Sequence, residues 1–241
     1  MNIKNHIPNG ITSLNLISGC IGIYFALKGQ IMYASYAIAL AAIFDFFDGM
    51  VARLLHVKSI IGRDLDSLAD VVSFGVLPGF IALVFLKTAC VSIEIPLLKN
   101  YVPFVAFIIP VFSAIRLAKF NNDTRQTDSF IGMPTPANAM IWGSLPLIAH
   151  QTIQGSFVAN LILNPYILIF LILLTSYLLV AELPLFSLKF KSLKVHDNKT
   201  RFIFLGISLI LLLLIGFVAI PLIILIYILL SVIENIFCKK Q

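Results

Sequence analysis

The chain contains few charged residues and few residues that bind soft metals. Of its 241 residues, 12% are Asp, Glu, Lys or Arg, whereas 60% are hydrophobic and the mean hydropathy is +1.02. So little charge excludes an ordinary soluble domain and indicates an integral membrane protein. The three cysteines are far apart, which excludes a disulfide framework and a Cys-x-x-Cys metal site. The basic residues form no continuous stripe, which excludes nucleic acid as a partner.

The apolar residues fall into eight runs that lack the alternating pattern of β-strands. We therefore expect an all-α, polytopic membrane bundle of about eight transmembrane helices. The runs lie at roughly 11–27, 31–54, 66–86, 101–120, 136–149, 163–187, 202–217 and 219–237. As one helix of about 36 residues, the last two would measure about 54 Å against an apolar membrane core of about 30 Å, so we expect a tight turn near Gly216–Pro221. The prediction is a single domain over 1–241, with a core at about 1–187 and an additional helical hairpin at about 200–238.

Lys and Arg are distributed unevenly between the predicted loops. With the N-terminus inside the cell, fourteen of the seventeen basic residues lie on the inner side, and only Lys28, Lys87 and Lys99 lie on the outer side. Cytoplasmic loops of membrane proteins carry such an excess of basic residues. Both termini are therefore predicted to be cytoplasmic.

Four aspartates interrupt the apolar sequence at the inner ends of the second and third predicted spans. Asp45 and Asp48 belong to the pattern Asp-x-x-Asp-Gly-x-x-Ala-Arg, and Asp66 and Asp70 to the pattern Gly-x-x-x-Asp-x-x-x-Asp. These spacings put each pair on one face of its helix, so the two pairs can face each other. Four carboxylates this close repel each other unless a cation is bound. Oxygen ligands without His or Cys favour Mg²⁺ or Mn²⁺, with Ca²⁺ as an alternative, and we expect two ions.

Small residues and an arginine share the face of the first aspartate pair. Gly49 and Ala52 leave room for a large ligand to approach the backbone, and Arg53 can reach the edge of the same face. A guanidinium group forms bidentate hydrogen bonds with phosphate, so the combination indicates a diphosphate pocket. The alternative is that the aspartates cap helix ends or pair with Arg53, Lys58 and Arg63. That alternative does not account for all four aspartates at this spacing.

These residues resemble the signature of the CDP-alcohol phosphatidyltransferase family. The matching positions are Asp45, Asp48, Gly49, Ala52, Arg53, Gly62, Asp66 and Asp70. The resemblance implies a helical membrane enzyme that transfers a phosphatidyl group from CDP-diacylglycerol to an alcohol and releases CMP, with its active site facing the cytoplasm. It implies that Asp45, Asp48 and Asp66 bind metal, and that Asp70 completes the second metal site and acts as the general base. The residues that it implies for binding CDP-diacylglycerol are Gly49, Ala52, Arg53, Ser59, Gly62, Asn9 and Thr12.

Three further strings, at 67–75, 116–121 and 132–137, resemble the phosphatidylserine synthase branch of this family. That resemblance implies L-serine as the acceptor and phosphatidylserine as the product. Arg116 and Lys119 lie at an inner helix end, where they would supply positive charge for the serine carboxylate. The alternative for this pair is ordinary positive charge on the inner side of the membrane. Gly132–Pro136 is equally explained as a rigid turn, and Glu182 either binds a partner or lies at the membrane interface.

Two alternatives stay open at this point. One is the same chemistry with glycerol phosphate or inositol phosphate as acceptor, although those acceptors need further cationic groups for their phosphate. The other is a membrane cation transporter, although carboxylates gathered at one membrane face beside Arg53 fit conduction poorly. By analogy with the family we expect a homodimer, and membrane lipids are expected partners. The compact length and the lack of organelle signals lead us to expect a bacterial inner membrane.

Overall fold

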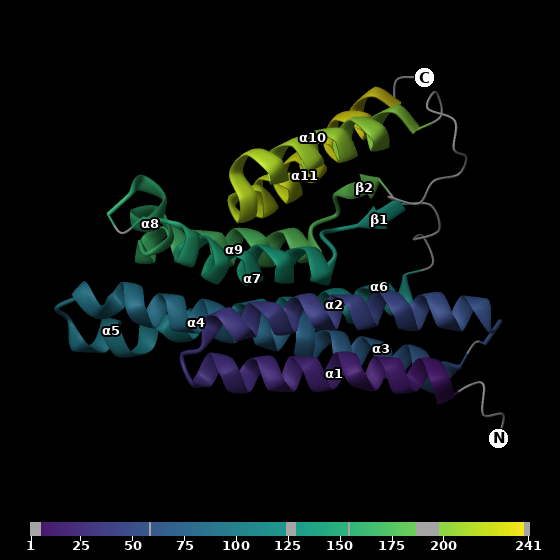
Figure 1. Ribbon diagram of the computed structural model, residues 1–241, viewed down its shortest axis with the longest axis horizontal. Coiled ribbons are helices and arrows are strands. Elements are labelled where there is room, and N and C mark those ends of the chain that lie inside the picture. The colour runs from purple at the N-terminus through teal and green to yellow at the C-terminus, as the bar shows by residue number, and fades with distance from the viewer. Residues whose placement is uncertain (1–5, 58, 124–128, 154, 187–197, 239–241) are drawn as a thin grey trace.

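The computed structural model describes residues 6–57, 59–123, 129–153, 155–186 and 198–238, and nearly all of them are helical (Figure 1). The first two helices, α1 (His6–Leu27) and α2 (Ile31–Leu54), are antiparallel neighbours. The remaining α-helices are α3 (Ile60–Val71), α4 (Leu77–Ala89), α5 (Pro96–Tyr101), α6 (Ile108–Asn122), α7 (Thr135–Gln151), α8 (Phe157–Ile162), α9 (Pro165–Val180), α10 (Lys199–Ile215) and α11 (Ala219–Cys238). Residues 187–197, which include three lysines, lie outside the described residues. The expectation of a helical membrane bundle is confirmed.

Four helical stretches of the described part of the chain are long and apolar enough to cross a membrane. They are His6–Leu27, Ile60–Ala89, Pro96–Asn122 and Thr200–Asn235. The second stretch joins α3 to α4 through a π-helical segment, Val72–Val76. Such segments interrupt α-helices mostly at functional sites, and this one directly follows Asp70. The chain is therefore an integral membrane protein, and Asp66 and Asp70 lie near the start of the second stretch.

The face of α1 that packs against other helices is made of small and polar residues. Its buried positions are Pro8, Thr12, Asn15, Ser18, Gly19, Gly22 and Ala26. A Cβ built on Gly19 would lie 2.9 Å from the Cα of Ser73, and one on Gly22 would lie 2.8 Å from the Cβ of Ala37. Helices in lipid associate by such close packing of small residues. The fit brings α1 against both α2 and the π-helical segment.

One short sheet departs from the purely helical prediction. Strand β1 (Ser129–Ile131) pairs antiparallel with β2 (Pro184–Phe186), and Ile131 lies opposite Pro184. Directly after β1, Gly132 adopts a φ of +76°, and its amide donates to the carbonyl of Leu183 over 2.9 Å. A Cβ at Gly132 would lie 2.6 Å from the carbonyl oxygen of Leu179, so only glycine fits this turn. Gly132 therefore forms part of a rigid turn, which is one of the two interpretations of Gly132–Pro136 given by the sequence.

The last two helices lie side by side and contact the rest of the molecule through α11 (Figure 1). Gly216 separates them with a φ of +57°, and the rings of Phe204 and Tyr227 are 5.7 Å apart across the pair. The Asn235 side chain donates to the carbonyl of Pro184 over 2.8 Å. The C-terminal helices are thereby attached to the short sheet.

Candidate metal and nucleotide site

Three of the four aspartates converge. Asp45 and Asp48 come from α2 and Asp66 from α3, and each offers a carboxylate oxygen within 4.8 Å of the others. Spacings of three residues on one helix and a facing position on the next produce this cluster, as helix geometry predicts. Because all ligand atoms are hard oxygens, the cluster fits a divalent cation of the Mg²⁺, Mn²⁺ or Ca²⁺ type. Asp70 lies one turn beyond Asp66 on α3 and is 7% exposed.

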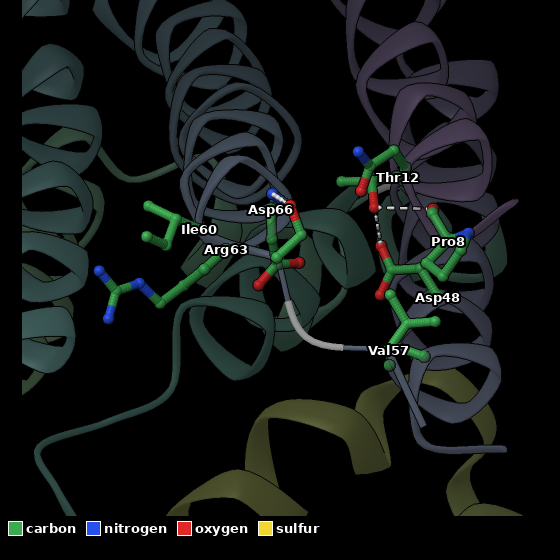
Figure 2. A pocket seen from close by; sticks show the side chains of 12 residues that line it. Pro8, Thr12, Asp48, Val57, Ile60, Arg63 and Asp66 are labelled. Atoms are coloured by element: carbon green, nitrogen blue, oxygen red, sulfur yellow. Dashed lines mark hydrogen bonds between the residues drawn. The ribbon is translucent and has the colours of Figure 1, made fainter. Parts of the chain in front are cut away.

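A hydroxyl group on α1 holds Asp48 in place. Thr12 Oγ1 donates to Asp48 Oδ2 over 2.6 Å, and the Pro8 carbonyl oxygen, at 3.1 Å, is its second acceptor (Figure 2). Thr12 and Asp48 are both buried. The sequence predicted Thr12 as a nucleotide contact, and the structure gives it this further role. A hydrogen bond to a metal-binding carboxylate fixes the orientation of the ligand oxygen.

An amide group on α1 holds Asp70. The Asn15 side chain donates to Asp70 Oδ1 over 3.2 Å, and the Ser73 hydroxyl donates to the Asn15 carbonyl over 3.0 Å. Sequence analysis missed Asn15. The available signal was its position three residues after Thr12, because that spacing puts the two polar side chains on one face of an otherwise apolar helix.

A cavity of about 680 Å³ opens beside the aspartates (Figure 2). Its walls come from the start of α1, the end of α2 and the start of α3. The lining residues are Pro8, Asn9, Thr12, Asp48, Gly49, Ala52, Val57, Ser59, Ile60, Gly62, Arg63 and Asp66. Six of the seven positions predicted to bind the nucleotide substrate are among them. Cavities of roughly 300–1,000 Å³ accommodate small molecules and cofactors.

Close backbone packing shapes the wall of this cavity at the start of α3. Ser59 caps the helix by accepting a hydrogen bond from the Gly62 amide over 3.2 Å. A Cβ at Gly62 would lie 3.0 Å from Asn9 Oδ1, whereas one at Gly49 would meet nothing within 4 Å. Gly49 therefore leaves open space in the cavity, and Gly62 permits the close approach of α1 to α3.

The two arginines near the cavity are placed differently from the prediction. Arg53, predicted to grip the diphosphate, is exposed, donates from Nε to the Gly49 carbonyl over 2.9 Å, and is not among the lining residues. Arg63 does line the cavity, although its guanidinium extends away from Asp66 (Figure 2). Its contact with Asp64, at 3.9 Å between groups about 60% exposed, is weak. From the sequence, Arg63 was named only as an ion-pair partner of the aspartates in the alternative interpretation.

Arg116 and Lys119, predicted to bind the acceptor, lie together at a second, smaller cavity. Its volume is about 40 Å³, and both side chains line it. Arg116 is 7% exposed, and its guanidinium lies 5.0 Å from the ring centre of Phe120. Asp70 is an electrostatic neighbour of Arg116, so the second cavity lies on the same side of the bundle as the aspartates.

Comparison with known proteins agrees with this site. The chain is 34% identical over 198 residues to the CDP-diacylglycerol–serine O-phosphatidyltransferase of Mycobacterium leprae, which covers 79% of this chain and 61% of that protein. It is 37% identical over 136 residues to the enzyme of the same name from Helicobacter pylori, covering 56% and 54% of the two chains. It is 38% identical over 136 residues to that from Bacillus subtilis, covering 56% and 72%.

The matches to the M. leprae and H. pylori proteins span a little over half the length of those relatives. The model of one family, described as CDP-alcohol phosphatidyltransferase, matches residues 5–185, which include both helices that carry the aspartates and the residues that line both cavities. The resemblance seen in the aspartate signature is confirmed. This chain belongs to the CDP-alcohol phosphatidyltransferase family.

Proposed function

We propose that the protein transfers the phosphatidyl group of CDP-diacylglycerol to the hydroxyl of L-serine, giving phosphatidylserine and CMP. The observation that carries the proposal is the position of Asp45, Asp48 and Asp66 at one side of a cavity lined by small residues. A bound diphosphate needs cations to balance its charge and space beside the backbone of the helix. The three carboxylates can bind the cations, and Gly49 and Ala52 leave the space. The names of the relatives support serine as the acceptor.

The residues of the large cavity would hold the nucleotide end of the donor. Asn9, Ser59 and Gly62 lie where α1 and α3 meet, and Gly49 leaves the wall of α2 open. Asp45, Asp48 and Asp66 would hold Mg²⁺ or Mn²⁺, with Asp70 completing a second ion site. When bound, such ions neutralise the charge that develops on the phosphate and on the leaving CMP. Ca²⁺ is the alternative ion.

Asp70 would act as the general base. In the proposed step the serine oxygen forms a bond to the phosphorus atom that carries diacylglycerol, the bond from phosphorus to the CMP oxygen breaks, and the hydroxyl proton passes to Asp70. Asn15 holds one carboxylate oxygen of Asp70 and leaves the other for the proton. Direct attack within a ternary complex is proposed, and trapping a covalent phosphatidyl-enzyme would contradict it.

The membrane arrangement is also part of the proposal. About eight helical segments would cross the membrane with both termini in the cytoplasm, because that assignment places fourteen of the seventeen basic residues on the inner side. The aspartates then face the cytoplasm. A bacterial inner membrane and a homodimer are the proposed setting, the latter by analogy with the family.

Acceptor identity is tested with purified protein and CDP-diacylglycerol. L-serine, glycerol phosphate and inositol phosphate are supplied separately, with Mg²⁺, with Mn²⁺ or with a chelator, and CMP release and lipid product are measured. Metal-dependent formation of phosphatidylserine is expected only with serine. If lipid product forms with glycerol phosphate or inositol phosphate but not with serine, that compound is the acceptor and the proposal of serine is wrong. Cation flux into liposomes without any transfer activity would favour a transporter instead.

A further inference from the structure

We propose that the small cavity at the end of α6 binds a zwitterionic amino acid, with Glu182 and Asp123 holding its ammonium group and Arg116 and Lys119 holding its carboxylate. The proposal rests on the proposed function, because it names the residues that select the acceptor. Arg116 and Lys119 were already predicted from the sequence to bind the carboxylate. The assignment of Glu182 and Asp123 to the ammonium group is new. It rests on the presence of both acidic residues in the lining of the cavity.

The cavity is lined by charges of both signs and by few other residues. Arg116 and Lys119 come from the last turns of α6, Asp123 follows that helix, and Glu182 lies between α9 and β2. The volume of about 40 Å³ exceeds the roughly 10–15 Å³ that one water molecule needs. It is far smaller than the cavity of about 680 Å³ beside the aspartates. The size suits a ligand of a few non-hydrogen atoms and excludes a nucleotide.

Arg116, which lines this cavity, has a buried donor atom without a hydrogen-bond partner among the described residues. The side chain is 7% exposed, and its Nε has no hydrogen-bond partner among the described residues. A buried donor on a charged group that stays unpaired is destabilising, because it has lost its hydrogen bonds to water. An anionic group in the cavity would satisfy this donor, and the carboxylate of an amino acid has the planar shape that a guanidinium binds best.

Two opposite charges of the cavity, Lys119 and Glu182, do not pair with each other. Within the part of the chain that the structure describes, neither Lys119 nor Glu182 forms an ion pair. Had the two groups neutralised each other, the cavity would offer no net recognition of either end of a zwitterion. Held apart, they offer a cationic side and an anionic side. A ligand with a carboxylate and an ammonium group on one carbon matches both.

The cavity is also placed to deliver a hydroxyl toward Asp70. Asn121, near the end of α6, donates to the Ser67 hydroxyl on α3 over 2.8 Å, so the end of α6 lies against the turn after Asp66. Arg116 has Asp70 as an electrostatic neighbour. An amino acid held by its carboxylate at Arg116 would therefore keep its side-chain hydroxyl on the side of the general base.

The turn after β1 builds the wall that carries Glu182. The Gly132 amide donates to the Leu183 carbonyl, and the Met133 amide donates to the Leu178 carbonyl, each over 2.9 Å. These bonds fix the segment between α9 and β2 on both sides of Glu182. Glu182 therefore lines the cavity from a backbone segment that is held on both sides. A specific contact to an ammonium group requires such a fixed backbone.

The test compares serine with 3-hydroxypropanoate, which keeps the carboxylate and hydroxyl but lacks the ammonium group. Binding to the purified protein is measured by calorimetry with Mn²⁺ and CDP present, and transfer from CDP-diacylglycerol is measured separately. The wild type should bind serine and not the analogue. Glu182→Gln should weaken serine binding and raise the KM for serine about tenfold, leaving kcat and the KM for CDP-diacylglycerol within about twofold.

Two controls separate charge recognition from damage to the fold. Glu182→Asp should keep part of the serine affinity, because it keeps the charge. Glu94→Gln removes an exposed carboxylate two residues before α5, which lies at the opposite end of the molecule from β1 and β2 (Figure 1), and should change neither measurement. Unchanged serine binding in both Glu182→Gln and the double variant with Asp123→Asn would overturn the proposal, as would equal binding of serine and 3-hydroxypropanoate.

The same experiment distinguishes this inference from the proposed function. Serine binding that depends on Glu182, without any phosphatidylserine formed, would support the amino-acid site and contradict the proposed transfer. Phosphatidylserine formation that is insensitive to Glu182 and Asp123 would support the transfer and contradict the site.

Discussion

The polar residues of α1 act on aspartates that belong to other helices. Thr12 reaches Asp48 on α2, and Asn15 reaches Asp70 on α3. Neither contact follows from the aspartate pattern, because local helix geometry fixes which residues of one helix share a face but not which face of a neighbour they meet. The same limit explains Arg53, whose hydrogen bond to its own helix takes it out of the cavity wall. The convergence of Asp45, Asp48 and Asp66 was predictable, since it depends on spacing along two adjacent helices.

Removing the Thr12 hydroxyl should weaken metal binding without removing any metal ligand. Thr12→Val keeps the shape of the side chain but loses the 2.6 Å hydrogen bond to Asp48. The Mn²⁺ concentration for half-maximal activity should rise by about 10–100-fold, the usual effect of losing a hydrogen bond to a ligand. Ser13→Ala, which removes a hydroxyl bonded only to the Asn9 carbonyl, should leave the Mn²⁺ dependence unchanged. Equal Mn²⁺ dependence in the wild type and Thr12→Val would contradict this role.

At the scale of elements, the approach of α1 to the π-helical segment positions the general base. The backbones are so close at Gly19 and Ser73 that a Cβ would meet the Ser73 hydroxyl oxygen and Cα. The long helical segments, their order and the turn at Gly216 were accessible from hydropathy and length alone. The β1–β2 pair was not, because its register joins residues more than fifty positions apart and one strand begins with a proline.

Adding a methyl group at Gly19 should separate α1 from the helix that carries Asp70. Gly19→Ala should destabilise the protein by about 1–3 kcal/mol, as overpacking of a filled interface does. It should also lower transfer activity, because Asn15 and Ser73 lose their register. Gly10→Ala on the same helix meets nothing within 4 Å and is the matched control. Thermal unfolding in detergent measures the effect, and identical midpoints for the two variants would contradict the close contact.

At the scale of the whole molecule, the distribution of basic residues predicts the direction of every span. Among the described residues, four helical stretches are long and apolar enough to cross a membrane, whereas the apolar runs of the sequence predict about eight spans. The two numbers differ in part because helices such as α7 and α9 have only 17 and 16 residues. The proposed orientation places both cavities on the cytoplasmic side.

The orientation can be measured by cysteine labelling in intact cells. After replacement of the native cysteines, Glu94→Cys should react with a membrane-impermeant thiol reagent from outside. Asp64→Cys should react only after the membrane is permeabilised. Both side chains are exposed in the structure, so accessibility reports the side of the membrane rather than burial. Labelling of Asp64→Cys in intact cells would contradict the proposed orientation and indicate the opposite one.

The most direct test of the central claim, metal-dependent phosphatidyl transfer at the aspartate cluster, is a stoichiometric assay of purified protein with CDP-diacylglycerol and labelled serine. Asp66→Asn keeps the size of the side chain but removes one charge from the three converging carboxylates. The account predicts one CMP released per phosphatidylserine formed, no reaction in chelator, and at least about a 100-fold lower rate in Asp66→Asn. Transfer that continues at the wild-type rate in chelator or in Asp66→Asn would contradict it.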